Sequence, residues 1–118
     1  MAKNTEDDSE KTWVATHRFA RISPTKVRHI AALIRRKSAE EALATLKFVP
    51  NRGARFLEHV LRSAVANAED QGSVDAADLV VVEVRINEGP RLKRIQPRAR
   101  GTAYPIICRM SHIHVAVA

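Results

Sequence analysis

An alternating pattern of side chains begins at Trp13. One set of alternate positions is Trp13, Ala15, His17 and Phe19, and the other is Val14, Thr16, Arg18 and Ala20. Such alternation is typical of a strand that buries one face. We therefore expect a short strand here, with the side chains of the first set directed toward the core.

Helical spacing of apolar residues follows this strand. Ser23 and Pro24 suit the N-cap and first position of a helix, and Ser38 with Glu41 has the spacing of a capping box that opens a second helix before Pro50. The apolar stripes that support these helices are Val27, Ile30, Ala31 and Ile34 in the first and Ala42, Leu43 and Leu46 in the second.

A third and longest helix is expected beyond Pro50. Its apolar stripe runs toward Gly72, which we expect to cap the helix in the left-handed conformation. The stripe consists of Leu57, Val60, Leu61, Ala64 and Ala68.

Two further strands complete the predicted fold. The run from Leu79 to Ile86 is rich in β-branched residues, and Ile113, Val115 and Val117 alternate at the end of the chain. With the strand at Trp13 they predict an α+β fold, in which a three-stranded antiparallel sheet packs on three helices and a long β-hairpin protrudes. We expect a single RNA-binding domain over residues 12–118, preceded by an acidic, disordered tail at residues 1–11.

The segment between the last two strands is too long for a tight turn. From Gly89 to Met110 it contains six basic residues and no acidic one, and such charges repel one another unless a polyanion binds them. Extended chain as far as about Gln96, returning from about Gly101, would project on the order of 30 Å. We expect this arm, at about residues 87–109, to bind RNA phosphates.

Three structures for the arm remain open at this stage. Pro90, Pro97 and Pro105 restrict the chain, and apolar residues lie among the bases, which favours an ordered hairpin inserted between RNA helices. A disordered basic loop is the second alternative, and an element bound at a membrane surface is the third.

The charge of the whole chain agrees with a polyanionic partner. Its 20 lysine and arginine residues outnumber 13 acidic residues, four of which lie in the first ten positions. The single cysteine, Cys108, cannot form an internal disulfide, and no apolar run is long enough to span a bilayer. We therefore expect a cytoplasmic protein with no membrane partner.

Basic residues also line two of the predicted helices. An ordinary solvated helix face is the alternative explanation for either line taken singly, because exposed charge is common. The first line, a basic ridge, is Arg28, Arg35 and Arg36, and the second, a basic row with Glu58 to one side, is Arg52, Arg55, His59 and Arg62.

Catalytic and metal-binding functions have little support in the sequence. His112 and His114 would share one face of a strand, but no further ligands lie nearby, so we expect them at the sheet surface or against RNA. The sequence has no phosphate-binding glycine loop, nucleophile elbow or paired carboxylates. Trp13 and Tyr104 are too isolated to form a base-stacking platform, and we expect Trp13 to pack in the sheet. We expect no enzyme activity, no metal and no cofactor.

Several runs of residues resemble the family of large-subunit ribosomal protein twenty-two. The resemblance covers most of the chain, from Arg21 to Val117, and is strongest in the hairpin. The runs that carry it are Ser23–Arg36, Ser63–Glu69, Asn87–Pro90, Lys93 with Arg98–Gly101, and Ser111–Val117.

This resemblance implies a structural constituent of the large ribosomal subunit, with its globular domain near the exit of the peptide tunnel. Members of the family contact several domains of the large-subunit ribosomal RNA, support its assembly and line the nascent-peptide exit tunnel with the hairpin. The implied partners are that RNA, neighbouring large-subunit proteins and the nascent peptide, and no homo-oligomer is expected. A free RNA chaperone or regulator with a mobile basic arm is the alternative function.

Two sets of candidate site residues follow. The RNA-binding set is Arg18, Arg21, Lys26, Arg28, Arg35, Arg36, Arg52, Arg55, Arg62, Arg91, Lys93, Arg94, Arg98, Arg100, Arg109 and His112. The hairpin tip expected to line the tunnel is Arg91, Leu92, Lys93, Arg94, Ile95, Gln96, Pro97 and Arg98.

Two features depart from the family pattern. Thr102 stands where the family usually has a basic or amide residue, and Tyr104 and Pro105 follow it, so we expect fewer or rearranged phosphate contacts on the returning strand. The acidic extension before Trp13 is longer than in the simplest members, and its charge argues against tight contact with RNA.

Overall fold

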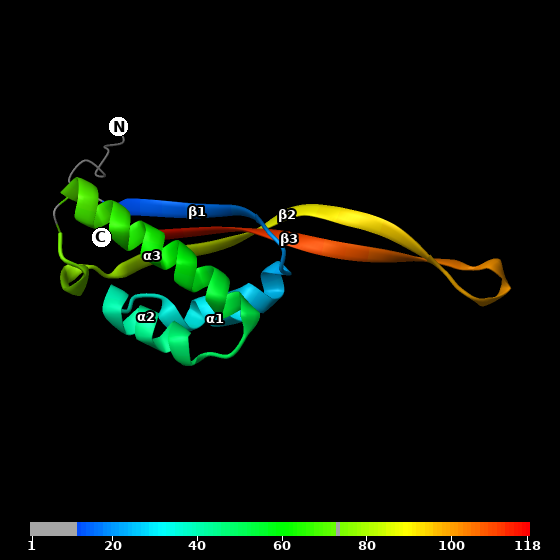
Figure 1. Cartoon of the computed structure of the whole chain (residues 1–118), viewed down its shortest axis with the longest axis horizontal. Coiled ribbons are helices and arrows are strands. Elements are labelled where there is room, and N and C mark those ends of the chain that lie inside the picture. The colour runs from blue at the N-terminus through cyan, green and yellow to red at the C-terminus, as the bar shows by residue number, and fades with distance from the viewer. Residues whose placement is uncertain (1–11, 73) are drawn as a thin grey trace, which may run out of the picture.

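The computed structural model describes residues 12–72 and 74–118 and contains a three-stranded antiparallel sheet with three α-helices packed against it. Figure 1 shows the helices together at one end of the molecule and a two-stranded arm at the other. The predicted α+β fold with a protruding hairpin is confirmed. Residues 1–11, which we expect to form a disordered tail, lie outside the described residues.

The three helices form where the spacing of apolar residues predicts them. Ser23, with extended backbone, and Pro24 occupy the N-cap and first positions of α1 (Pro24–Ile34), and the predicted stripe of this helix is buried. α2 (Ala39–Phe48) begins after Ser38, whose hydroxyl oxygen accepts a hydrogen bond from the Glu41 amide at 3.3 Å. α3 (Arg52–Gly72) buries its whole predicted stripe, so the three helices share one core with the sheet.

Gly72 is the last residue of α3, but it does not have the left-handed backbone of the predicted cap. The glycine with left-handed backbone is Gly101, with a φ of 72°, and not Gly72. A Cβ atom at Gly72 would lie only 2.3 Å from Cζ2 of Trp13. The predicted left-handed cap is therefore wrong, and the absence of a side chain instead allows the Trp13 ring to pack against the end of the helix.

The sheet has the strand order β1-β3-β2, with β1 (Trp13–Ala20) and β2 (Val81–Pro97) on either side of β3 (Ala103–Val117). The register between β1 and β3 shifts between His17 and Ala20, and Phe19 has a left-handed φ of 61°. This bulge buries Ala20 and leaves Phe19 55% exposed. The expectation that Phe19 faces the core is wrong, because the alternation of the strand ends at the bulge.

Side chains from the helices bind the backbone of both edge strands. Carbonyl groups at the edge of a sheet would otherwise lack a strand partner, so these bonds close the edges and fix the helices to the sheet. The donor and acceptor pairs are Arg28 Nη2 with Ile86 (2.9 Å), Arg35 Nη2 with Val84 (2.9 Å) and Asn67 Nδ2 with Val14 (3.0 Å).

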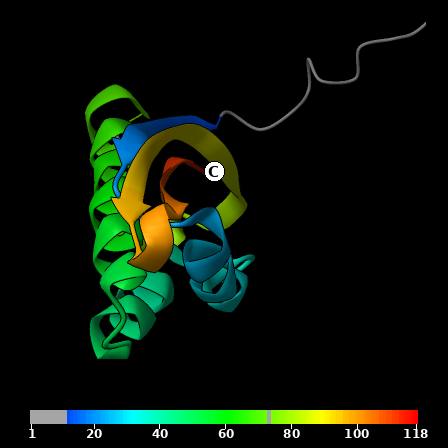
Figure 2. The same cartoon turned by 90° about the vertical axis from the view of Figure 1, so that its right-hand side faces the viewer.

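The arm is a continuation of β2 and β3 beyond the reach of β1. Pairing of β1 with β3 ends at Ala20 and Ser111, whereas the ladder of β2 with β3 continues to Pro97 and Ala103. The molecule is 63 Å along its longest axis, and Figure 1 shows the two strands projecting beyond the helices. Figure 2 looks along the arm from its far end, so the strands of the arm lie nearest the viewer there. This ladder agrees with the ordered-hairpin alternative and not with a disordered loop.

None of the helices in the described ranges has both the length and the apolar character needed to cross a membrane.

Candidate nucleic-acid interface

A tight turn at residues 98–102 closes the arm. The Arg98 amide donates to the Thr102 carbonyl oxygen at 2.7 Å, and the Thr102 amide donates to the Ala99 carbonyl oxygen at 3.3 Å. Arg100 (φ 61°, ψ 29°) and Gly101 (φ 72°) both have left-handed backbone, as in the type I′ turns that match the twist of a hairpin. Arg100 therefore lies at the apex of the arm.

The side chain of Thr102 supports this turn. Its hydroxyl group donates a hydrogen bond to the Ala99 carbonyl oxygen at 2.6 Å. A basic side chain at this position would carry charge, whereas threonine contributes to the local geometry of the turn.

The segment predicted as the tip lies mostly along the outgoing strand. Arg91 pairs with Arg109 and Gln96 pairs with Tyr104 in the β2–β3 ladder. The chain reverses at residues 98–102, so Pro97 and Arg98 are the members of the predicted tip that adjoin the turn. The chain therefore reverses close to where the sequence predicts, between about Gln96 and Gly101, and the predicted tip residues extend from that turn back along β2.

Most basic side chains of the arm lack an acidic partner among the residues that the structure describes. Arg91 is the exception, since its Nη2 atom lies 3.6 Å from a carboxylate oxygen of Glu88. Arg94 donates one hydrogen bond to the Lys93 carbonyl oxygen at 2.8 Å, which leaves its other donors free. All the bases from Arg91 to Arg109 are exposed and can bind phosphate oxygens.

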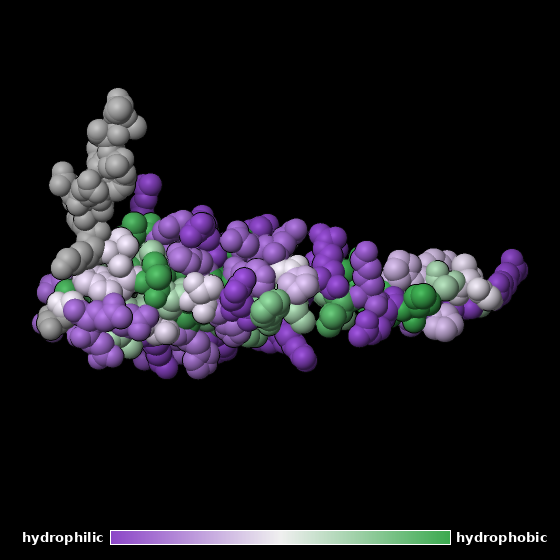
Figure 3. All heavy atoms as spheres, turned by 90° about the horizontal axis from the view of Figure 1, so that it is seen from above, coloured by the Kyte–Doolittle hydropathy of each residue, from purple (hydrophilic) through white to green (hydrophobic). Residues whose placement is uncertain are grey.

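Apolar side chains of the arm are exposed among these charges. Ile95 is 72% exposed and Ile106 is 41% exposed. Figure 3 shows hydrophobic and hydrophilic surface in alternation along the arm. Directly paired residues of a ladder point to the same side, and the next pair points to the other side. One face of the arm therefore carries the pairs Lys93 with Ile107 and Ile95 with Pro105. The other face carries the pairs Arg94 with Ile106 and Gln96 with Tyr104. Both faces combine apolar and polar groups, as expected of a surface that packs against a partner.

Two arginines of the predicted ridge on α1 also bind the sheet. Arg28 and Arg35 donate to β2 carbonyl oxygens, which occupies part of each guanidinium group and fixes its position. Arg36 follows the helix with a left-handed φ of 65°, and its side chain is exposed. Arg28 and Arg35 therefore combine a structural role with exposed charge, whereas Arg36 contributes exposed charge.

A buried carboxylate neutralises part of the basic row on α3. Glu58 is 8% exposed, and its two oxygens lie 3.3 Å from guanidinium nitrogens of Arg55 and Arg62. Arg55 also donates to the carbonyl oxygens of Leu46 at 2.5 Å and Val49 at 2.7 Å, at the end of α2. The sequence interpretation missed this pairing, although positions three and four apart on a helix are neighbours.

His112 and His114 lie at the sheet surface, one of their two expected positions. Nδ1 of His112 accepts a hydrogen bond from the Phe19 amide at 3.1 Å, and Nδ1 of His114 lies 3.2 Å from the Thr16 hydroxyl oxygen. The Phe19 ring packs edge-on against His112, and Cζ of Arg18 lies 5.9 Å from the centre of that ring. In residues 12–72 and 74–118, no three His, Cys, Asp or Glu side chains are grouped as metal ligands would be.

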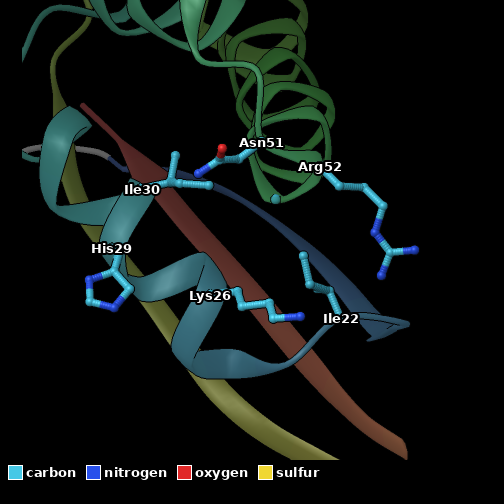
Figure 4. A pocket seen from close by; sticks show the side chains of 7 residues that line it. Ile22, Lys26, His29, Ile30, Asn51 and Arg52 are labelled. Atoms are coloured by element: carbon cyan, nitrogen blue, oxygen red, sulfur yellow. The ribbon is translucent and has the colours of Figure 1, made fainter.

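Basic residues from separate parts of the chain meet at the base of the arm. Two adjoining hollows, with volumes of about 540 and 550 Å³, share Ile22, Lys26 and Arg52 in their walls. Figure 4 shows the first hollow, between α1 and the start of α3, and the second extends to Leu92 and Arg109 of the arm. We call the two hollows together the arm-base cleft.

The sequence alone did not indicate this cleft. Arg21, Lys26, Arg52 and Arg109 belong to the predicted RNA-binding set, but they lie far apart in the chain and were not grouped. The polar wall residues Ser23, His29 and Asn51 were not predicted as site residues. Only the packing of α1, α3 and the arm brings these residues together.

Comparison with known proteins gives consistent matches. A sequence model of the family described as ribosomal protein L22p/L17e matches residues 15–118. Three proteins named large ribosomal subunit protein uL22 are similar over nearly their whole lengths. The protein from Caldicellulosiruptor saccharolyticus is 50% identical over 116 residues, which cover 98% of this chain and 94% of that protein. The protein from Desulfosudis oleivorans is 51% identical over 104 residues (88% and 90%), and that from Rhodopirellula baltica is 52% identical over 108 residues (87% and 91%).

Proposed function

We propose that this chain, which belongs to the ribosomal protein L22p/L17e family, is a structural constituent of the large ribosomal subunit and binds large-subunit ribosomal RNA. Its partners are that RNA and neighbouring large-subunit proteins, and it acts in the cytoplasm as part of the ribosome. Its contribution is positional and electrostatic, and no catalytic step is assigned to it.

The observation that carries this proposal is the arm. Its two strands are paired from the domain to the turn, and basic side chains without acidic partners in the described chain alternate with exposed apolar ones. Arginine and lysine bind phosphates, while isoleucine and tyrosine side chains can pack against sugars and bases. A two-stranded ribbon is also narrow enough to enter the space between RNA helices.

A role in assembly fits the distribution of charge. Exposed bases lie both on the helical domain, at Arg21 and Arg36, and at the far end of the arm, at Arg98 and Arg100. The molecule is 63 Å long, so these two groups of bases can contact RNA segments that are remote from one another. Binding both segments at once would hold them in their relative positions while the RNA folds.

We propose further that the end of the arm lines the channel through which the nascent peptide leaves the ribosome. The turn at residues 98–102, with the adjoining residues Gln96 and Tyr104, is the part of the chain most distant from the helices (Figure 1). Exposed arginine and tyrosine side chains there can contact a passing peptide without a defined pocket. Crosslinking of a stalled nascent peptide to a photoreactive residue introduced at position 100 tests this role.

Sedimentation with crosslinking tests the main proposal. Cell extract is washed in high salt and fractionated on a sucrose gradient, and RNA crosslinked to residues 91–100 is then sequenced. Association with the large subunit and crosslinks to its RNA are expected. Slow sedimentation with crosslinks spread over many RNAs would instead support a free RNA chaperone with a mobile arm.

A further inference from the structure

We propose that the arm-base cleft binds one unpaired nucleotide of the large-subunit ribosomal RNA, with the base on an apolar floor and the phosphate between basic side chains. This inference rests on the proposed function and adds to it a defined site, separate from the contacts along the arm. Three properties of the cleft support it, namely its charge, its shape and its rigidity.

The walls of the cleft are positively charged. No acidic side chain of the described residues lines either hollow, and none of the cleft's four bases forms an ion pair in that part of the chain. The starts of α1 and α3 have no acidic residue in the first turn, so the helix dipoles add to the positive potential. An anionic ligand is therefore favoured. The four bases are Arg21, Lys26, Arg52 and Arg109.

The floor of the cleft is apolar. Ile22 and Ile30 are 5% and 2% exposed at its bottom, and Leu92, Ile107 and Met110 line the side formed by the arm. An inorganic phosphate ion would leave this surface in contact with water. A nucleotide has both parts that the cleft requires, because its base has a flat apolar face and its phosphate is charged.

The size of the cleft favours one nucleotide over a double helix. Each hollow has a volume of about 540 or 550 Å³, within the range of roughly 300 to 1,000 Å³ for small-ligand sites. A duplex presents its phosphates on a broad convex surface and cannot insert a paired base. An unpaired base in a loop or bulge can be turned out of its stack and enter the cleft.

Two hydrogen bonds fix the wall of the cleft before any ligand binds. The Arg52 guanidinium donates to the Arg21 carbonyl oxygen, and the buried Ser111 hydroxyl donates to the Ile22 carbonyl oxygen at 2.5 Å. These bonds come from two different elements, α3 and β3, and hold the segment of residues 21–22 between them. Gly53 contributes by close packing, since a Cβ atom there would lie 2.9 Å from Cδ1 of Ile30. A rigid site loses little conformational entropy on binding.

Chemical footprinting of large-subunit ribosomal RNA bound to the full-length chain tests this site. Lys26→Ala removes a charge from the cleft, and its control Lys47→Ala removes an equal charge from the exposed end of α2. Ile107→Ala shortens the apolar lining, and its control Leu33→Ala removes as many carbon atoms from an exposed apolar side chain of α1 that lines neither hollow. Lys26 is exposed, so its replacement leaves the fold intact.

We expect the wild-type chain to protect a discrete unpaired nucleotide from base-specific modification. Both cleft variants should lose this protection and bind the RNA roughly fivefold less tightly, while both controls keep it. If the cleft variants and their controls give the same footprint as the wild type, the inference is wrong although the proposed function stands. That result would also follow if a segment of a neighbouring protein fills the cleft. If the wild-type chain protects no RNA, the proposed function itself fails, and the inference fails with it.

Discussion

The guanidinium group of Arg28 donates from both Nε and Nη2 to a single acceptor, the carbonyl oxygen of Ile86, at 3.2 and 2.9 Å. Ile86 lies on the edge strand β2, shortly before the arm leaves the sheet. These two hydrogen bonds attach α1 to the base of the arm. They explain why a residue predicted only to contact RNA also has a structural role.

Replacing Arg28 with Ala should therefore lower the free energy of unfolding by about 1–2 kcal/mol, because a partly buried carbonyl group loses a charged donor. Arg28→Lys should recover part of the loss, since an ammonium group retains a donor but not the fork geometry. Urea unfolding measures both values. Lys26→Ala, at an exposed position on the same helix, is the control and should change stability little. Equal effects at the two positions would contradict a structural role for Arg28.

Arg55 and Arg62 should differ in their effect on stability although both contact Glu58 at 3.3 Å. Arg55→Ala also removes hydrogen bonds to the carbonyl groups at the end of α2, so we expect a loss of about 1–3 kcal/mol. Arg62 is about half exposed, and within the described residues its side chain makes only the ion pair, so Arg62→Ala should cost under about 0.5 kcal/mol. Thermal and urea unfolding of the two variants provide the measurement. A larger loss for Arg62→Ala would mean that the ion pair, and not the cap of α2, stabilises this region.

Removing charge from the arm should weaken RNA binding and reduce its dependence on salt. In the triple variant Lys93→Ala, Arg94→Ala and Arg98→Ala, the slope of log Kd against log salt should fall by up to about one unit per lost phosphate contact. Filter binding at several salt concentrations measures the slope. Arg85→Ala is the matched control, because Arg85 is paired with Glu83 at 2.8 Å on the sheet and not on the arm. An unchanged slope in the triple variant would exclude phosphate contacts by these residues.

Gly72→Ala should destabilise the domain, because its Cβ atom would lie 2.3 Å from the Trp13 ring. We expect a loss of about 1–3 kcal/mol, typical of overpacking in a well-packed site. Trp13 is the only tryptophan of the chain, so its fluorescence reports the unfolding directly in this variant. Trp13→Leu should be followed by circular dichroism. In the double variant the cost of Gly72→Ala should largely disappear, and additive costs would show that the two residues do not interact.

The parts of the fold predicted from the sequence depend on local periodicity. The stripe that includes Val27 and Ile34 is buried as predicted, because every fourth or third position of a helix faces the same side. The two errors, at Phe19 and Gly72, depend on contacts with residues distant in the chain. Phe19 packs edge-on against His112 at 5.1 Å, and Gly72 makes room for Trp13. No local pattern contains that information.

The same distinction applies to the candidate interface. The arm was predictable, because a long run of bases without an acid between two strands is visible in the sequence itself. The turn lies close to its expected place between Gln96 and Gly101, but its geometry was not predicted, since Arg100 adopts a left-handed backbone without being glycine or asparagine. The pairing of Glu58 with two arginines and the arm-base cleft were missed, because each depends on how side chains from different turns or elements meet.

The number of residue pairs in the arm determines which face the side chains near its end point to. Consecutive pairs, such as Lys93 with Ile107 and Arg94 with Ile106, point to opposite faces. Inserting or deleting one pair in the arm would therefore turn every side chain beyond it to the opposite face. Arg98, for example, would then point to the side opposite to the one it now faces. Only changes of two pairs, about 7 Å of arm, preserve both surfaces. Variation in arm length during evolution should accordingly occur in even steps, wherever both faces of the arm are in contact with partners.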